Sequence, residues 1–350
     1  MAYDYLNRFC RPLPVQRHRA ESEFLEALHN ISFAKTVSVY KPFDLLIDDE
    51  GRVGGKYVIT AHALALLCDL LAPGLGQLVR HLIRERKTTP AVEVLNSVVS
   101  AELDTLRDYY RMLFAPIGSE QVLFDVREAD LPAVEIFNLY QQCHAGLPGL
   151  SFSHGVIYYP SAYVTFIDPL TRLDFGETQF YDGVLLRLAR GRGPLYRASA
   201  AVCPVLHWSG ADGRSYRATS CAASWFPVAD PEIPVLSQAK VSPYSAAYAH
   251  QAFQNSANYT LAQVLSQWQP ARNNHLRRQI VRMQALAKGL AEQQNSKATG
   301  MHFFLAYARE LDYADAERNY KMVSELAPSL WSFFTKTEVE NVKGSFPRKR

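Results

Sequence analysis

The sequence predicts an α+β fold in which helical N- and C-terminal parts flank a β-rich middle segment. Apolar residues recur at helical spacing through most of residues 1–147 and again through residues 236–350. Between them, in residues 148–235, glycine, proline and β-forming residues dominate. The 350 residues can bury a sizeable core, and a content of 48% apolar and 20% charged residues is typical of a globular protein.

The first region begins with a short amphipathic helix, expected over Ala20–Ile31. A strand follows over Val37–Ile47, interrupted at Pro42 and closed by a turn at Asp48–Gly51. The start and stop signals of the remaining segments then predict four further helices. They are a helix capped by Thr60 and ending at Leu71, a second that continues after the break at Pro73 and Gly74 to about Glu85, one over Ala91–Phe114 after Pro90, and one from Asp130 to near Gly146.

Short runs of β-branched and aromatic residues, separated by turn residues, predict the strands of the middle region. They are Val156–Tyr159, Ala162–Ile167, Val184–Leu188, Ser199–Trp208 and Ser215–Phe226. Helical periodicity returns after Val235 and predicts four helices in the third region. They are Ala246–Trp268, Ala271–Gln293, Thr299–Leu311 and Asp315–Leu326.

The stretch Ile233–Ala291 contains no aspartate or glutamate, although it carries several lysines and arginines. The formal net charge of the chain is only +3, so the distribution of charge is more informative than its sum. A local surface of this kind attracts phosphates and releases their counterions, whatever bases the nucleic acid carries. The acid-free stretch therefore predicts a nucleic-acid partner.

The expected helix Ala271–Gln293 concentrates this charge. Its apolar residues Leu276, Ile280, Met283 and Leu290 form one stripe, which leaves the cations on the remaining faces. A solvated basic surface is the alternative explanation, but an ordinary surface helix would pair arginine with glutamate four residues away. The candidate nucleic-acid-binding residues are Arg272, His275, Arg277, Arg278, Arg282 and Lys288.

A few residues of the middle region are of types that serve in catalysis or metal binding. Ser153-His154 and His207-Trp208-Ser209 contain residue types used in nucleophilic catalysis, but neighbours in sequence do not define a triad, and no Gly-x-Ser-x-Gly motif is present. A group of carboxylates could offer oxygen ligands to a divalent cation, although acidic residues are also common in turns. The carboxylates are Asp168, Asp174, Glu177 and Asp182. We predict no catalytic residue, metal or cofactor.

The cysteines are odd in number, widely spaced and without a Cys-x-x-Cys pair, which favours a reducing compartment. No signal peptide is visible at the N-terminus. The longest apolar run, Val58–Leu71, is too short to span a bilayer, so no membrane association is expected.

The segment Ser242-Pro243-Tyr244-Ser245, followed by Ala252-Phe253 and Ala271-Arg272-Asn273, resembles the central motif of rhabdovirus nucleoproteins. The resemblance covers about a tenth of the chain. It implies that Arg272 contacts RNA phosphate. The β-rich middle region departs from the all-helical fold of that family.

The order of a helical part, a β-rich part and a second helical part is similar to the coats of small double-stranded RNA viruses of the partitivirus type. Both resemblances imply a non-enzymatic viral structural protein that forms homo-oligomers and encloses or coats nucleic acid, with RNA as the expected partner. The expected location is the virion and the host cytoplasm. Two alternatives stay open: a phage or plasmid DNA-binding protein of strand-annealing or single-strand-binding type, and a metal-dependent enzyme that uses the Asp168–Asp182 carboxylates.

Overall fold

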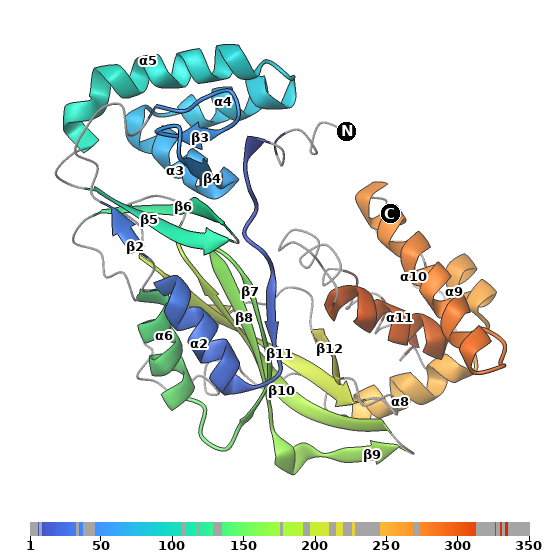
Figure 1. The fold of residues 1–350 in the computed structure, drawn as a ribbon. Helices are drawn as coiled ribbons and strands as arrows, with labels where there is room; N and C mark the ends of the chain where they lie inside the picture. The colour runs from blue at the N-terminus through green and yellow to red at the C-terminus, as the bar shows by residue number, and fades with distance from the viewer. Residues whose placement is uncertain are drawn as a thin grey trace, which may run out of the picture. The chain divides into compact units, whose positions relative to one another are not determined.

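The computed structural model contains helices and two β-sheets, which confirms the α+β class (Figure 1). The Cα positions divide the chain into two compact units. Unit 1 comprises residues 1–144, 155–163 and 187–200, and unit 2 comprises residues 145–154, 164–186 and 201–350. The structure describes residues 6, 9–32, 35–37, 46–106, 110–117, 119–128, 135–175, 178–191, 197–209, 215–219, 226–227, 246–268, 274–312, 326, 330 and 333–334.

Unit 1 contains a five-stranded sheet that the sequence analysis did not predict. Its strand order is β2-β5-β6-β4-β3, and all neighbours are antiparallel except β4 and β6, which run parallel. Strand β6 is buried along most of its length, from Val122 to Arg127. The strands are β2 (Lys35–Val37), β3 (Arg52–Val53), β4 (Tyr57–Ile59), β5 (Tyr110–Ile117) and β6 (Glu120–Glu128).

Most helices of unit 1 lie where the sequence signals predict them. The predicted cap at Thr60 is confirmed, because its side chain accepts a hydrogen bond from the amide of Ala63. Helix α3 contacts α4, α5 and β6, and their apolar side chains form a common core. The helices are α2 (Glu21–Ser32), α3 (Ala61–Leu71), α4 (Leu75–Arg84), α5 (Thr88–Leu106) and α6 (Glu135–Ala145).

The second sheet has eight strands, in the order β1-β7-β8-β10-β11-β12, with β9 paired to β10 and β13 paired to β11. Each predicted strand of the middle region coincides with a strand of this sheet, although β7 and β10 begin several residues earlier than predicted. Of the last predicted strand, Ser215–Phe226, the structure describes only the two ends, as β12 and part of β13. The strands are β1 (Gln16–His18), β7 (Ser151–Tyr158), β8 (Ser161–Ile167), β9 (Leu173–Phe175), β10 (Thr178–Ala189), β11 (Ser199–Ser209), β12 (Ser215–Thr219) and β13 (Phe226–Pro227).

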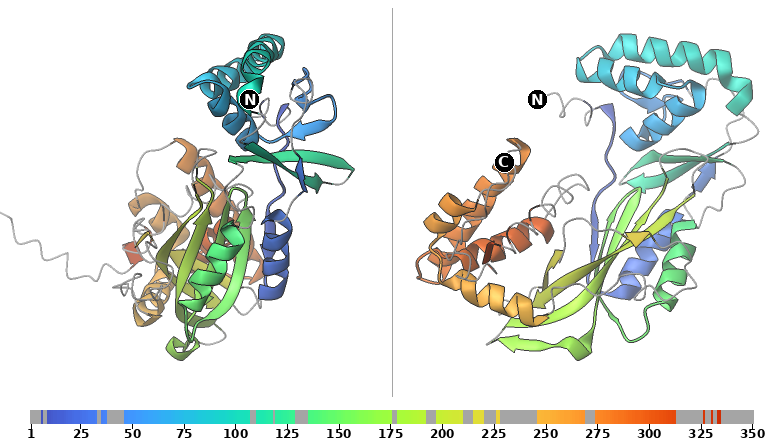
Figure 2. Two further views of the ribbon diagram at one scale, coloured as in Figure 1. Left: turned by 90° about the vertical axis from the view of Figure 1, so that its left-hand side faces the viewer. Right: turned by 180° about the vertical axis from the view of Figure 1, so that it is seen from behind.

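Four helices of unit 2 pack as one group, which we call the helical module (Figure 2). Helix α11 lies at its centre and contacts α8, α9 and α10 as well as strand β12. The helices are α8 (Ala246–Ala257), α9 (Leu261–Gln267), α10 (Asn274–Gln293) and α11 (Gly300–Asp312).

Two predicted helices were wrong in their extent. The helix expected over Ala91–Phe114 ends at Leu106, because Met112 and Phe114 are buried on strand β5 instead. The helix expected over Ala246–Trp268 is two helices, and Thr260 begins the second as its N-cap. The predicted helix Asp315–Leu326 falls outside the described residues except for its last residue, Leu326, and the break at Pro42 falls outside them entirely.

Candidate nucleic-acid interface

Capping interactions fix the ends of the helices in the helical module. At the start of α9, Thr260 and Gln263 form a capping box in which each side chain bonds the other residue's backbone amide. At the end of α10, Asn295 has a positive φ of 49° and Ser296 N–H donates to the carbonyl of Ala291. This is a Schellman arrangement, which satisfies the last carbonyls of α10 and turns the chain toward α11.

The start of α11 is fixed by a buried histidine. The Nδ1 atom of His302 lies 3.2 Å from the amide nitrogen of Thr299, and its Nε2 atom lies 3.0 Å from Oε1 of Gln294. Because a backbone N–H can only donate, Nδ1 is the acceptor, and the protonated Nε2 donates a hydrogen bond to Oε1 of Gln294. Burial lowers the pKa of His302, in agreement with this neutral tautomer.

Helix α10 buries the apolar stripe predicted for it. Leu276, Met283 and Leu290 are buried, and Ile280 is half-buried. The stripe meets α11, the helix with which α10 has its most extensive contact. The opposite side of α10 is therefore free to face solvent.

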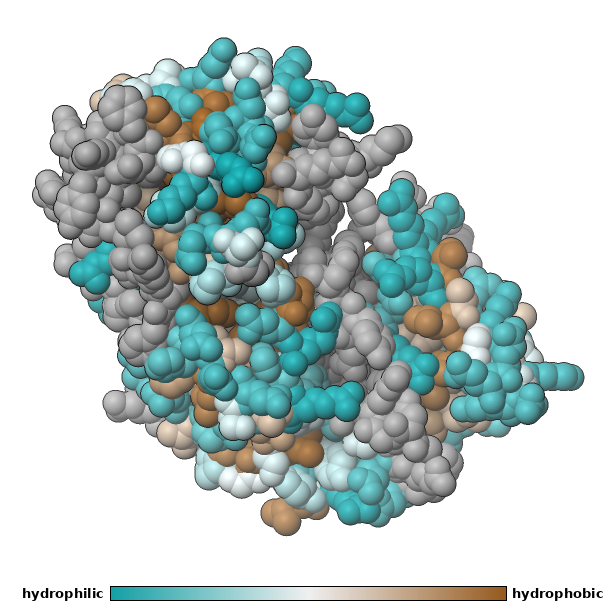
Figure 3. Space-filling model, in the orientation of Figure 1, coloured by the Kyte–Doolittle hydropathy of each residue, from teal (hydrophilic) through white to brown (hydrophobic). Residues whose placement is uncertain are grey.

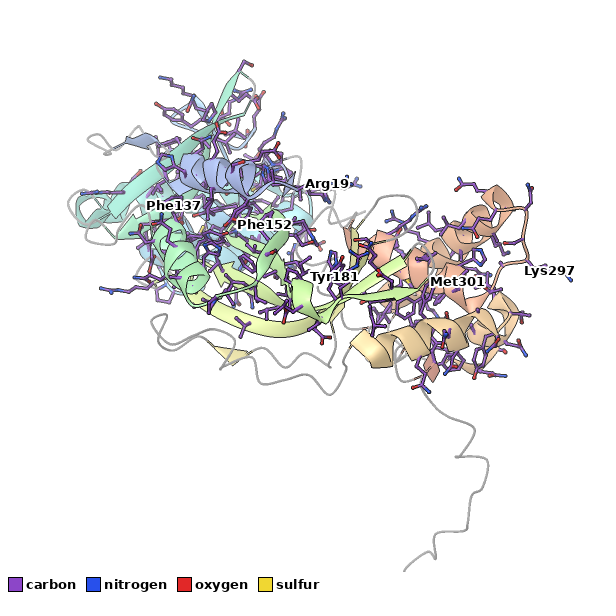
Figure 4. All side chains as sticks on the ribbon, turned by 90° about the horizontal axis from the view of Figure 1, so that it is seen from below. Arg19, Phe137, Phe152, Tyr181, Lys297 and Met301 are labelled. Atoms are coloured by element: carbon purple, nitrogen blue, oxygen red, sulfur yellow. The ribbon has the colours of Figure 1, made fainter. Side chains whose placement is uncertain are left out.

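Four of the predicted binding residues lie on this exposed side. Arg277, Arg278, Arg282 and Lys288 are all exposed, and we call these four residues the basic face. Their guanidinium and ammonium groups are held at helical spacing on one rigid element. Lys297, in the turn after α10, is also exposed and points away from the helices (Figure 4).

The structure does not describe the side chains of the remaining two predicted residues, His275 and Arg272. His275 belongs to the first turn of α10, but its side chain is outside the described part of the structure. Arg272 lies outside the described residues, as does the Ser242–Ser245 segment of the nucleoprotein-like motif. The structure therefore brings Arg277, Arg278, Arg282 and Lys288 together on one helix.

One carboxylate approaches the basic face from another helix. Glu310 of α11 is buried, and its Oε1 atom lies 3.4 Å from Nε of Arg282. The stretch Ile233–Ala291 contains no acidic residue in its sequence. In the folded structure, however, the carboxylate of Glu310 on α11 lies next to it. Among the described residues, Arg277, Arg278 and Lys288 have no carboxylate within ion-pair distance.

A groove of about 400 Å³ runs beside this ion pair, between α10 and α11. Hydrophobic surface flanked by hydrophilic surface is visible over these helices (Figure 3). We call the groove between α10 and α11 the Glu310 groove. Its lining residues are Arg282, Ala285, Leu286, Gly289, Leu290 and Gln293 of α10, with Arg309 and Glu310 of α11.

Three of the residues with side chains of catalytic type lie close together. Ser153 Oγ lies 2.8 Å from Nε2 of His207 and 3.2 Å from Nδ1 of its neighbour His154. Ser153 and His207 belong to different strands, so their meeting is not visible in the sequence. The Tyr181 ring, labelled in Figure 4, is 6.1 Å from that of His207, and its hydroxyl donates to Gln179. The serine hydroxyl thus belongs to a polar network on the sheet.

The acidic group of the middle region is dispersed into structural contacts. Asp168 caps the short helix η2 (Pro169–Thr171) by accepting from the amide of Leu170, and Asp174 pairs with Arg172. Glu177 lies outside the described residues. Within the part of the chain that the structure describes, no three histidine, cysteine or acidic side chains are grouped to hold a metal ion.

Sequence reasoning missed a buried charged cluster in unit 1. Asp125 on β6 is fully buried, and its Oδ2 atom accepts from Nε of Arg127 at 2.6 Å and from the hydroxyl of Tyr159. Arg190 lies 3.6 Å from the same oxygen, and His62 lies 3.7 Å from Oδ1. Apart from Arg127, these partners are distant in sequence, so no local pattern could have identified the cluster.

Comparisons of this chain with protein-family models, with curated proteins and with solved structures give no match. In the described residues, no helix is both long and apolar enough to cross a membrane.

Proposed function

We propose that this chain is a non-enzymatic viral structural protein of the capsid or nucleocapsid type, which self-assembles and coats nucleic acid, most naturally RNA. The basic face of α10 carries the proposal. Cations fixed on a packed helix neutralise phosphates without first having to be ordered, and the counterions they release favour binding to any sequence. A coat has to accept a whole genome, so sequence-independent binding suits it.

Two further observations support this choice. Glu310 lies near only one of the four cations of the basic face, which leaves Arg277, Arg278 and Lys288 available for phosphate. The two sheets also favour a coat of mixed architecture over an all-helical nucleoprotein. The self-assembly part of the proposal rests only on the resemblance of the predicted order of helical and β-rich regions to the coats of double-stranded RNA viruses.

The binding test reverses charge on the basic face alone. Arg277→Glu with Arg278→Glu should strongly weaken binding to a fluorescent single-stranded RNA, measured by anisotropy, because two phosphate contacts become repulsions. The salt dependence of log K should become shallower by about 0.7 for each lost contact. Arg84→Glu with Lys87→Glu, two exposed cations near the junction of α4 and α5, makes the same change of charge elsewhere and should bind like the parent. Unchanged binding by the α10 variant would contradict the proposal.

The assembly test uses the purified full-length chain. Electron micrographs and light scattering should show closed shells or filaments, with or without added RNA. A protein that remains monomeric at all concentrations is not a coat. Small rings that bring complementary strands together would instead favour a strand-annealing protein, which also uses basic surfaces on single strands.

A further inference from the structure

The turn between strands β8 and β9 displays a leucine to solvent. Leu170, in the short helix η2, is 93% exposed, more than any other large apolar side chain in the described part of the chain. A single exposed apolar side chain is common on protein surfaces and does not by itself indicate a partner. Leu170 differs from such a residue because the backbone that carries it is fixed.

Hydrogen bonds hold this turn, residues 168–174, which we call the Leu170 tip. The carboxylate of Asp168 accepts from the amide of Leu170 at 3.0 Å, and the carbonyl of Asp168 accepts from the amide and the hydroxyl of Thr171. Strand β10 closes the turn, because the amide of Asp182 donates to Oγ1 of Thr171 and its carbonyl accepts from the amide of Asp168. A partner that covers Leu170 therefore meets a turn that is already ordered, which lowers the entropy lost on binding.

The Glu310 groove is a concave surface with an apolar floor. Leu286, Gly289 and Leu290 line it from α10, and a Cβ atom built on Gly289 would meet nothing within 4 Å. Its volume of about 400 Å³ lies in the range that holds a small ligand, and is ample for one leucine side chain. An aliphatic side chain placed on this floor would be removed from water without displacing a hydrogen bond of its own.

The charges around the two surfaces are complementary. At the Leu170 tip, Asp168 and Asp174 outnumber the one cation, Arg172. Around the groove, two arginines outnumber the one glutamate. Opposite charges of this kind steer two surfaces together and favour one orientation of the contact.

We propose that Leu170 of one copy of this chain inserts into the Glu310 groove of a second copy. The inference rests on the proposed function, and it names the contact through which the chain assembles. Leu170 does not occupy the groove of its own copy, because its side chain is almost fully exposed.

The tip and the groove are different surfaces, so the contact between copies is heterologous. Each copy that inserts its tip still presents its own groove to the next, and the contact propagates into a ring, a filament or a larger assembly. Arg277 and Arg278 do not line the groove, so they remain accessible to RNA in the assembled chain.

Two variants each remove one side of the contact. Leu170→Asp places a charge where the leucine is buried, and Gly289→Leu fills the groove with a residue that favours helix more than glycine does. Either change should raise the concentration at which light scattering detects assembly by about tenfold or more, because the burial of one leucine is lost. Leu78→Asp on α4 and Ala262→Leu on α9 make the same kinds of change at other exposed positions, and both should assemble like the parent.

Mixing the two variants tests the heterologous geometry. The Leu170→Asp copy keeps an intact groove and the Gly289→Leu copy keeps an intact tip, so one of each should join into a pair that cannot grow. Analytical ultracentrifugation of an equimolar mixture should show dimers at a concentration where each variant alone is monomeric. A mixture that stays monomeric, or one that assembles as the parent does, would overturn the inference.

RNA binding separates failure of the inference from failure of the proposed function. Both variants keep Arg277 and Arg278, so each should bind a single-stranded RNA dodecamer with the affinity of the parent, which also shows that the helical module is folded. If the parent assembles and both variants assemble equally well, the contact between tip and groove is excluded and the coat proposal stands. A parent protein that stays monomeric would instead overturn the proposed function, and the inference with it.

Discussion

At the residue scale, the buried carboxylate of Asp125 is the side chain whose removal should cost the most stability. Arg127 and Arg190 stay buried when the carboxylate is deleted, and breaking a buried ion pair from one side typically costs about 3–5 kcal/mol. Asp125→Ala should therefore lower the midpoint of urea unfolding far more than Asp69→Ala, which removes an exposed carboxylate. Equal midpoints for the two variants would contradict this assignment.

The stability that Asp125 contributes should depend on pH over a defined range. Burial by itself would raise the pKa of Asp125, but His62, Arg127 and Arg190 outweigh it and lower the pKa to about 2. The unfolded chain has the ordinary aspartate pKa of about 3.9, so it binds the proton more readily than the folded chain does. The contribution of Asp125 is thus complete above about pH 4 and is lost as the pH falls toward 2. The difference between parent and Asp125→Asn midpoints should shrink over that range.

Residues of this kind mark the limit of the sequence analysis. Thr60 could be predicted as a cap because its partner lies three residues away. The cluster around Asp125 could not, because Tyr159 and Arg190 reach it only through the tertiary fold. The contact between Glu310 and Arg282 could not be predicted for the same reason. The absence of acidic residues from a stretch of sequence does not exclude an acidic residue of another helix packed against it.

At the scale of elements, the junction between α10 and α11 should respond to pH. His302 is neutral in the fold, and its pKa is lowered by burial, so protonation favours the opened state. Its stabilising contribution is present above the ordinary histidine pKa of about 6.5 and is lost as the pH falls below it. Protonation also places a hydrogen on Nδ1, which can then no longer accept the hydrogen bond from the backbone N–H of Thr299.

Hydrogen exchange measures this response directly. Amides of residues 296–303 should open more readily at pH 5.5 than at pH 7.5, once intrinsic exchange rates are corrected. Peptides of α4, where His81 is exposed, serve as the control and should show no such change. Equal opening free energies at both pH values would show that His302 does not hold the junction.

Periodicity predicted α10 well because its apolar stripe and its cations are both local features of one helix. It failed at α5, where the chain leaves the helix after Leu106 and enters strand β5. Apolar residues such as Met112 and Phe114 can serve either element, and pairing with β6 decides between them.

At the scale of the whole molecule, the α+β class was predictable, but the five-stranded sheet was not. Its parallel pair joins β4 to β6 across helices α3, α4 and α5, so the pairing involves residues more than sixty positions apart. Strands β2, β3 and β4 carry too few residues for a period of two to be recognised. Strand β5 is longer, but part of it was assigned to the preceding helix. Most strands from β7 to β12 could be predicted because β-forming residues and turn residues mark them in the sequence.

A self-assembling coat should bind long RNA cooperatively, because each bound copy offers contacts to the next. At protein amounts below saturation, mass photometry of a long RNA should show two populations, one fully coated and one bare. A dodecamer that holds a single copy should titrate without cooperativity. Arg277→Glu with Arg278→Glu should weaken both reactions, since it alters phosphate contact and not the contact between copies. A graded series of partly coated RNAs would identify an independent single-strand binder and exclude a coat.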